Sequence, residues 1–190
     1  MRKSKIKRET KETTIDIRID LEGTGKAEVQ TGICFFNHLL ESFTKHGRFD
    51  IKAKSLGDFK HHIAEDTMIA LGIALNKALG DKKGIRRMGD AIVPMDDALA
   101  LVAVDLGGRV YSKVEVDFTK KRLNDLNSDL LVHLLETFAS NAKLNLHVKL
   151  MRGDNDHHKA EAIFKALGVA LSEAVSLTGV DEVPSAKGVI

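Results

Sequence analysis

The sequence predicts an internally duplicated α+β protein, in which helices pack between four-stranded sheets or on one face of them. Three short blocks recur in the same order at a nearly constant offset: residues 38–43 as 133–138, 61–65 as 157–161, and 70–75 as 166–171. Both copies also share one order of strand-like and helix-like patterns, which indicates a repeated structural unit. We therefore expect a single compact domain with two halves, residues 1–86 and 87–190, and a linker at 81–87.

Each half begins with two stretches in which apolar and polar residues alternate. They are residues 13–21 and 26–30 in the first half, and 98–105 and 110–118 in the second. Alternation of this kind is typical of half-buried strands, and glycines between the two stretches supply turn residues. We expect each pair to form an antiparallel hairpin.

Two helices and a strand complete each half. Apolar side chains recur at helical spacing in both, at Ile33, Phe36, Leu39, Leu40 and Phe43, and at Leu130, Leu131, Leu134, Leu135 and Phe138. Strands follow at 49–53 and 144–150, and then long helices at 61–79 and 157–176, with Gly80 and Gly179 as helix stops. Because each half has one helical face to bury, we expect the halves to pack helix side to helix side.

Composition and charge exclude several classes of protein. The two signs of charge nearly cancel, to a formal net charge of +2, so we expect no binding to nucleic acid. The basic residues at 2–8 then indicate a solvated, partly frayed N-terminus, with a nucleic-acid arm as the alternative. No apolar run is long enough to span a membrane, and we expect no secretory signal, because no apolar stretch follows the N-terminal charges. Cys34 is the only cysteine, which fits a reducing cytoplasm.

The second long helix of each half carries a pattern typical of metal ligands. Residues four apart share a helix face, so His61 points the same way as Glu65, and the same spacing recurs at 157 and 161. Imidazole combined with carboxylate suits Mn, Fe or Zn. Adjacent helical residues diverge by about 100°, so His61 and His62 should serve two different ions.

The duplication predicts two symmetric metal sites. One would use His61, Glu65, His133 and His158, and the other His157, Glu161, His38 and His62. A lone histidine is more often structural than a ligand. Six histidines and two glutamates that repeat in register favour metal binding, because packing has no use for paired imidazoles.

The chain resembles the imidazoleglycerol-phosphate dehydratase family over almost its full length. The matching segments are Arg-Glu-Thr-Lys-Glu-Thr at 8–13, Thr-Gly-Ile-Cys-Phe-Phe-Asn-His at 31–38, His-His-Ile-Ala-Glu-Asp at 61–66, Pro-Met-Asp-Asp-Ala-Leu at 94–99, Asn-Asp-His-His-Lys-Ala-Glu-Ala at 155–162 with Phe-Lys-Ala at 164–166, and Ser-Ala-Lys-Gly at 185–188. The match departs from the usual family pattern at Asn37, Ser42, Met88, Ala186 and in the short loop 57–60. No metal ligand is affected by these differences.

The resemblance implies a fold, an assembly and a reaction. The fold would be ribosomal protein S5 domain 2-like, and the assembly a 24-subunit homo-oligomer with active sites between subunits. Each active site would hold two Mn²⁺ ions, so the ligands of one ion need not come from one chain. The reaction would be that of a histidine-biosynthesis lyase, which dehydrates D-erythro-imidazole glycerol phosphate to imidazole acetol phosphate. Its course would involve a metal-stabilised imidazolate and a carboxylate base.

The resemblance also implies the residues that contact the substrate. Glu12 would be the general base, although the sequence without the resemblance favours an exposed charge at a strand start. The further substrate-binding residues, most of them for the phosphate, would be Arg87, Asp96, Arg109, Lys165, Ser185 and Lys187. Lys165 has independent support, because it follows Glu161 by four residues and so shares its helix face.

The sequence is also compatible with two other functions. The same ligands could activate water in a two-metal phosphoester hydrolase. The chain could also be a metal-storing or metal-stapled oligomer without catalytic activity.

Overall fold

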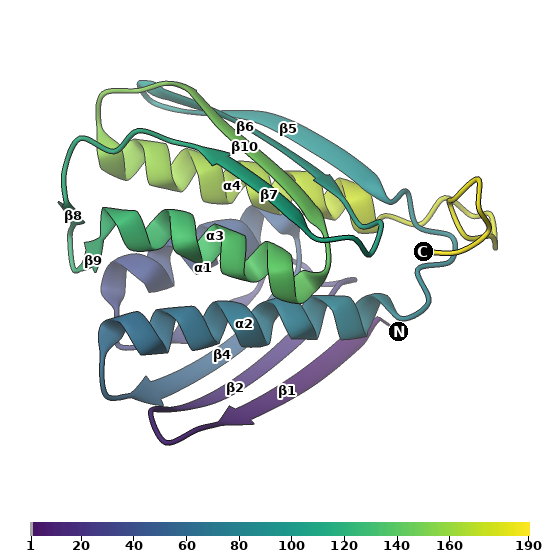
Figure 1. Cartoon of the computed structure of the whole chain (residues 1–190), viewed down its shortest axis with the longest axis horizontal. Helices are drawn as coiled ribbons and strands as arrows, with labels where there is room; N and C mark the ends of the chain where they lie inside the picture. The colour runs from purple at the N-terminus through teal and green to yellow at the C-terminus, as the bar shows by residue number, and fades with distance from the viewer. Residues whose placement is uncertain (1) are drawn as a thin grey trace.

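The computed structural model describes residues 2–190, which form two four-stranded sheets with a double layer of helices between them (Figure 1). The first sheet has the order β1 (Lys3–Glu9), β2 (Thr13–Asp20), β4 (Asp50–Gly57), β3 (Ala27–Gln30), and its helices are α1 (Cys34–Gly47) and α2 (Lys60–Leu79). The second has the order β5 (Met88–Met95), β6 (Ala98–Asp105), β10 (Asn145–Arg152), β7 (Tyr111–Glu115), with helices α3 (Ser128–Ala142) and α4 (Asp156–Val175). The duplicated α+β fold is thereby confirmed. The boundary at residues 86 and 87 stays a prediction.

The strand neighbours differ from the hairpins that the sequence predicted. Strand β4 lies between β2 and β3, antiparallel to the first and parallel to the second. In the second half β10 separates β6 from β7 in the same way. A parallel pair needs a crossover connection, which α1 and α3 supply. Alternation indicates a strand but not its partner, and for that reason the hairpin prediction was wrong.

Each half also has an edge strand that the sequence reading did not include. Strand β1 pairs with β2 along its whole length, so the predicted frayed N-terminus is wrong for residues 3–8. The lysines of β1 point outward and form ion pairs, as Lys3 does with Asp20 at 2.7 Å. Charged outward side chains protect a sheet edge from further pairing. Strand β5 occupies the same place in the second half.

The ends of the two long helices differ from each other. Helix α2 ends at Gly80, whose positive φ of 59° suits glycine, as predicted. Helix α4 ends at Val175, within one residue of the predicted end, but its C-terminal cap is Ser176, so the stop predicted at Gly179 is wrong. Among residues 2–190, no helix is both long and apolar enough to cross a membrane.

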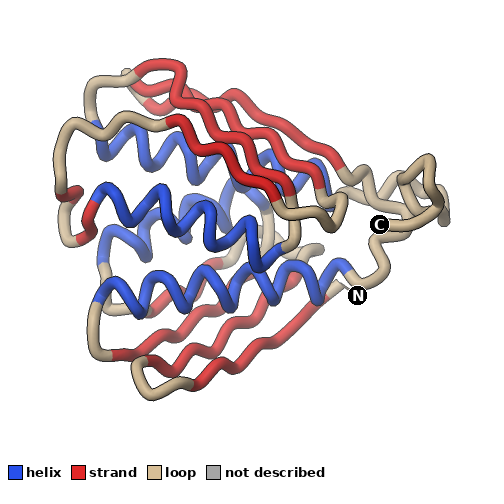
Figure 2. Tube along the Cα trace, viewed as in Figure 1, coloured by secondary structure: helices blue, strands red, loops and turns tan. Residues whose placement is uncertain are grey.

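The two halves pack through their helices, as predicted. Helix α2 packs on α3 and helix α1 packs on α4, between the sheets (Figure 2). Glycine permits the close approach at both crossings. A Cβ atom on Gly72 would lie 2.8 Å from the Phe138 carbonyl oxygen, and one on Gly168 would lie 2.4 Å from that of Phe43. The continuous core between the sheets therefore brings histidines from different helices together.

A buried ion pair at the start of α4 is hydrogen-bonded to the segment before β8. Asp156 is only 1% exposed and lies 2.7 Å from the Lys159 ammonium. Its carboxylate also accepts hydrogen bonds from the N–H groups of Thr119 and Lys120. Burial by itself would raise the pKa of Asp156, but these partners outweigh it and lower that pKa to about 2.

Asp156→Ala should lower the free energy of unfolding by roughly 3–5 kcal/mol, because Lys159 is left as a buried, uncompensated charge. The folded pKa lies below the unfolded value of about 3.9, so the stabilisation is present above about pH 4 and is lost as the pH falls towards 2. Urea unfolding at several pH values measures both effects. Asp154→Ala, at an exposed position nearby, is the control. Equal stability of the two variants at pH 7 would contradict the prediction.

Candidate metal centres

Among residues 2–190, two clusters of histidine and glutamate have ligand atoms within 4.8 Å of one another. The first cluster is His61, Glu65 and His133, and the second cluster is His38, His157 and Glu161. Each cluster combines the first turns of a long helix with a histidine from the helix packed against it. Both lie at the end of the molecule where α2 and α4 begin (Figure 1).

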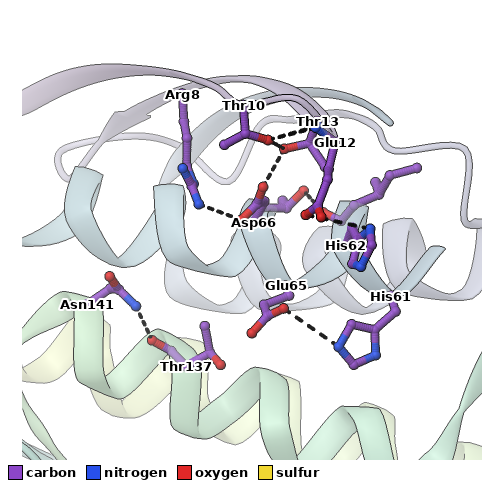
Figure 3. Close-up of polar contacts among 12 residues, drawn as sticks. Arg8, Thr10, Glu12, Thr13, His61, His62, Glu65, Asp66, Thr137 and Asn141 are labelled. Carbon is purple, nitrogen blue, oxygen red and sulfur yellow. Dashed lines mark hydrogen bonds and ion pairs between the residues drawn. The ribbon is translucent and has the colours of Figure 1, made fainter. Parts of the chain in front are cut away.

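The first cluster spans α2 and α3. One carboxylate oxygen of Glu65 lies 2.8 Å from His133 Nε2, and the other lies 3.6 Å from His61 Nε2. The His61 side of this arrangement is visible in Figure 3. The two imidazole rings are stacked, with centroids 5.9 Å apart. Two Nε2 atoms and one carboxylate therefore converge on one point.

The second cluster repeats this arrangement on α1 and α4. Glu161 Oε2 lies 3.2 Å from His38 Nε2 and 3.6 Å from His157 Nε2. Burial, followed by the nearby charge of His38, lowers the pKa of His157. Burial would raise the pKa of Glu161, but Lys165 and His38 outweigh it and lower that pKa. Both shifts favour the deprotonated forms that bind metals.

The donor sets of both clusters fit a transition-metal ion. Neutral imidazole nitrogen and carboxylate oxygen suit Mn, Fe, Co and Zn. Metal–ligand bonds to such donors are about 2.1 Å long, so donor atoms roughly 3 Å apart can bind one ion. The observed separations of 2.8–3.6 Å are in this range. Each cluster supplies three donors, which leaves positions for further ligands.

His62 and His158 belong to neither cluster, so one chain brings together three of the four residues expected in each site. Carboxylates engage their Nδ1 atoms instead. His62 Nδ1 lies 2.8 Å from Asp58, whose hydrogen bond raises the pKa of His62. His158 Nδ1 lies 2.5 Å from Asp97. A carboxylate on one ring nitrogen orients a histidine and leaves its Nε2 atom as the ligand atom.

The second half contains an insertion between β7 and α3 that lies beside the second cluster. It includes the short strands β8 (Arg122–Leu123) and β9 (Leu126–Asn127). In the turn between them, Asp125 accepts hydrogen bonds from the N–H groups of Cys34 and Phe35, at the start of α1. Asn124 Nδ2 lies 3.3 Å from His157 Nδ1. An open pocket of about 410 Å³ lies there, lined by Cys34, Phe35, His38, Asn124, Asp125 and His157.

Sequence reasoning did not identify Asn124 or Asp125 as part of the site. Neither residue has a counterpart in the first half, so the repeat could not reveal them. The available signal was the extra length between strand and helix in the second half.

Three of the predicted substrate-binding residues lie near the histidines. Glu12, in the turn between β1 and β2, has Oε2 3.7 Å from His62 Nδ1. Asp96, in the equivalent turn between β5 and β6, has Oδ2 3.6 Å from His158 Nε2. Lys165 Nζ lies 2.8 Å from Glu161 Oε1.

The other four lie at the opposite end of the molecule, where β5 begins and α4 ends (Figure 1). They are Arg87, Arg109, Ser185 and Lys187. Arg87 forms a two-bond ion pair with Asp105, at 2.7 and 3.0 Å, and donates to the Pro184 carbonyl. The hydrogen bond to Asp105 raises the pKa of Arg87. A single chain therefore does not bring these four residues to its own histidines.

Comparison with known proteins assigns the chain to a family. The family model described as imidazoleglycerol-phosphate dehydratase matches residues 31–171. This chain belongs to the imidazoleglycerol-phosphate dehydratase family. Imidazoleglycerol-phosphate dehydratase from Dehalococcoides mccartyi strain 195 is 51% identical over 191 residues, covering 100% of this chain and 97% of that protein. The Methanococcoides burtonii protein of the same name is 49% identical over 193 residues, covering 100% of both.

Solved structures of imidazoleglycerol-phosphate dehydratases share the fold. The enzyme from Staphylococcus aureus superposes with a TM-score of 0.85 at 34% identity, covering 93% of this chain and 99% of that one. The enzyme from Pyrococcus furiosus, in complex with (S)-C348, superposes with a TM-score of 0.86 at 36% identity. That superposition covers 97% of this chain and 100% of the Pyrococcus furiosus chain. The family resemblance in the sequence is therefore confirmed.

Proposed function

We propose that this chain dehydrates D-erythro-imidazole glycerol phosphate to imidazole acetol phosphate, a lyase step of histidine biosynthesis. The observation that carries the proposal is family membership over the full chain, combined with two clusters of metal-binding residues. The reaction removes water and leaves the phosphate ester intact.

The structures of substrate and product define the chemistry that the site must perform. In the product, the carbon next to the imidazole ring is a methylene group and the middle carbon is a ketone. The hydroxyl group must therefore leave from the carbon attached to the ring, and a proton must leave from the middle carbon. The resulting enol becomes the ketone by losing the proton of its hydroxyl group and gaining one at the ring-bearing carbon. The middle-carbon proton is only weakly acidic, so a positioned base is needed.

Glu12 is the proposed base. Its side chain is 57% exposed and its Oε2 atom lies 3.7 Å from His62 Nδ1, so a substrate bound at the histidines would be within its reach. A carboxylate within hydrogen-bond distance of the proton it removes is an effective general base. At the equivalent turn of the second half, Asp97 already accepts hydrogen bonds from Asp154 and Asn155 N–H and pairs with His158. Those hydrogen bonds hold the pKa of Asp97 well below its usual range, which makes it a poor base.

The proposed cofactor is Mn²⁺, with two ions per active site, held by the two histidine–glutamate clusters. When bound, such ions supply Lewis acidity and a template for the imidazole ring. The chain's own contribution is to keep Glu161 ionised and to aim the cluster imidazoles through Nε2. His62 and His158, oriented by Asp58 and Asp97, are proposed to complete ligand sets in neighbouring copies.

We propose that the active sites form between subunits of a large homo-oligomer, with 24 copies as the family resemblance implies. The separation of the two groups of candidate residues supports sharing. The cluster histidines lie at one end of the molecule, and the other end holds Arg87, Arg109, Ser185 and Lys187 (Figure 1). Contact between unlike ends of two copies would bring these cations and donors to the substrate phosphate, where Lys165 of the other copy would join them. A cytoplasmic location is also proposed, since a single cysteine suits a reducing compartment.

Incubation of the manganese-loaded protein with imidazole glycerol phosphate should yield one ketone per substrate consumed and no inorganic phosphate. Ketone formation by absorbance and phosphate release by a colorimetric assay test this directly, with metal-free protein as the control. Release of phosphate would instead indicate a two-metal hydrolase. Absence of both products would indicate a metal-storing oligomer.

A further inference from the structure

A buried polar network joins the turn that carries Glu12 to helix α2 (Figure 3). At its centre is Asp66, which is only 7% exposed. One carboxylate oxygen of Asp66 lies 2.9 Å from Arg8 Nη2, on β1. The other accepts a short hydrogen bond from the Thr13 hydroxyl, at the start of β2.

The network extends to the main chain on both sides of Glu12. The Thr10 hydroxyl oxygen accepts hydrogen bonds from Glu12 N–H at 3.1 Å and from Thr13 N–H at 3.0 Å. The Glu12 carbonyl accepts a hydrogen bond from Asp58 N–H. The backbone of the turn is therefore held against the residues that precede α2, and little freedom remains for the Cα atom of Glu12.

Helix α2 carries the other end of the network next to the metal ligands. Asp66 directly follows Glu65 and lies one helical turn after His62. Glu12 Oε2 lies 3.7 Å from His62 Nδ1 (Figure 3). A shift of the turn relative to α2 would therefore change the distance between the carboxylate of Glu12 and the metal-binding histidines.

The second half of the chain lacks this network. Arg8 pairs with Ile15 in the first hairpin, and Val93 pairs with Ala100 at the equivalent place in the second. By the same register and repeat, the positions of Thr10, Thr13 and Asp66 are occupied in the second half by Met95, Ala98 and Ala162. Ala98 and Ala162 are at most 1% exposed. The fold therefore accommodates small apolar side chains at these positions.

A gain in stability does not explain why the first half has polar residues at these positions. A buried ion pair is often no more stabilising than well-packed apolar residues, because both charges lose their hydration. Among the described residues, Arg8 Nε is also buried without a hydrogen-bond partner, which is a further cost. The polar residues occur only in the half whose turn carries Glu12.

We infer that Asp66, Thr13 and Thr10 are positioning residues that hold Glu12 in place relative to the histidines of α2. The inference rests on the proposed role of Glu12 as the general base. These residues do not touch the substrate. They act by fixing the backbone from which the Glu12 carboxylate projects, and the polar network is retained for this reason in the first half alone.

Thr13→Val is the main test, because valine keeps the shape of threonine and removes only the hydroxyl group. Thr67→Val is a matched control. The Thr67 hydroxyl is also buried between the first sheet and α2, but it lies 2.7 Å from the Ser55 hydroxyl and donates to the Ile63 carbonyl, both outside the turn. Thr13→Ser restores the hydroxyl group. Thr10→Val alters an exposed position and decides the question if Thr13→Val does not fold.

We expect Thr13→Val to lower kcat by about tenfold to hundredfold, since small displacements of a catalytic group have effects of this size. KM should stay within about twofold, because binding is not altered. Thr67→Val should lower Tm by as much as Thr13→Val does, with wild-type kcat. Thr13→Ser should recover most of the lost kcat. Thr10→Val should lower kcat several-fold, because the hydrogen bonds from Glu12 N–H and Thr13 N–H to the Thr10 hydroxyl are lost.

Wild-type kcat in both Thr13→Val and Thr10→Val, or an equal loss in Thr67→Val, would overturn the inference. Glu12→Gln separates this failure from that of the proposed function. If Glu12→Gln keeps full turnover, the base is wrongly assigned, and the network has no carboxylate to position. If Glu12→Gln loses turnover while the threonine variants do not, only the positioning inference is wrong.

Discussion

Glu12→Gln should lower kcat by roughly 10²- to 10⁴-fold, the contribution typical of a general base. Glutamine has the shape of glutamate but cannot accept the proton from the middle carbon of the substrate. KM should change little, because Glu12 is proposed to act on the proton and not to hold the phosphate. Initial rates of ketone formation over a range of substrate concentrations measure both quantities.

The matched control for this prediction is Glu9→Gln. Glu9 is on β1, and its side chain is 66% exposed and lies 3.5 Å from Lys7 Nζ. The Glu9→Gln substitution should leave kcat unchanged. Metal content and elution volume should also be the same in both variants, since neither residue belongs to a metal cluster. Turnover that survives Glu12→Gln with these properties intact would show that another group removes the proton.

Removal of the metal should break the proposed assembly into smaller units. Each cluster supplies three donors from one chain, and His62 and His158 lie outside both clusters with Nδ1 engaged by carboxylates. An ion that takes a fourth ligand from a neighbouring copy contributes its binding free energy to the association of subunits. Size-exclusion chromatography with light scattering, before and after treatment with a chelator, measures the change.

Acid should have the same effect as the chelator, because ligand histidines must be neutral to bind. An ordinary histidine has a pKa of about 6.5, so dissociation is expected below roughly pH 6. Asp58 raises the pKa of His62, which favours its protonated form as the pH falls. Manganese added back at pH 7.5 should restore the large species.

A double variant of His62→Asn and His158→Asn should assemble poorly even with manganese present. His147→Asn is the control, since His147 is exposed on β10 beside Tyr111 and belongs to neither cluster. Unchanged elution of the chelated protein and of the double variant would contradict a metal-linked assembly. In that case the subunits would associate through other surfaces.

The sequence located the candidate ligands through two short-range rules. Residues four apart share a helix face, and adjacent residues diverge, so His61 was grouped with Glu65 and separated from His62. Pseudo-symmetry then grouped His133 with the first of these helices and His38 with the second. The structure brings those residues together in its two clusters.

Other parts of the site depended on contacts that no local pattern encodes. The strand pairs predicted as hairpins are separated by β4 and β10, because the crossovers through α1 and α3 decide which strand inserts between them. The turn at Asn124 and Asp125 reaches the second cluster only through the tertiary packing of an insertion. The position of Arg87, far from the histidines of its own chain, likewise depends on the direction of each strand.

By itself the sequence determined the duplicated α+β fold, the helices and the set of candidate metal ligands, because all three depend on periodicities and on repetition along the chain. The tertiary structure alone decided the order of the strands, and it grouped three donors in each cluster with His62 and His158 outside them. It alone also revealed that a buried network of Arg8, Thr13 and Asp66 supports the turn of Glu12. Such contacts join residues far apart in sequence, and their geometry is set by how sheets and helices pack and not by local spacing.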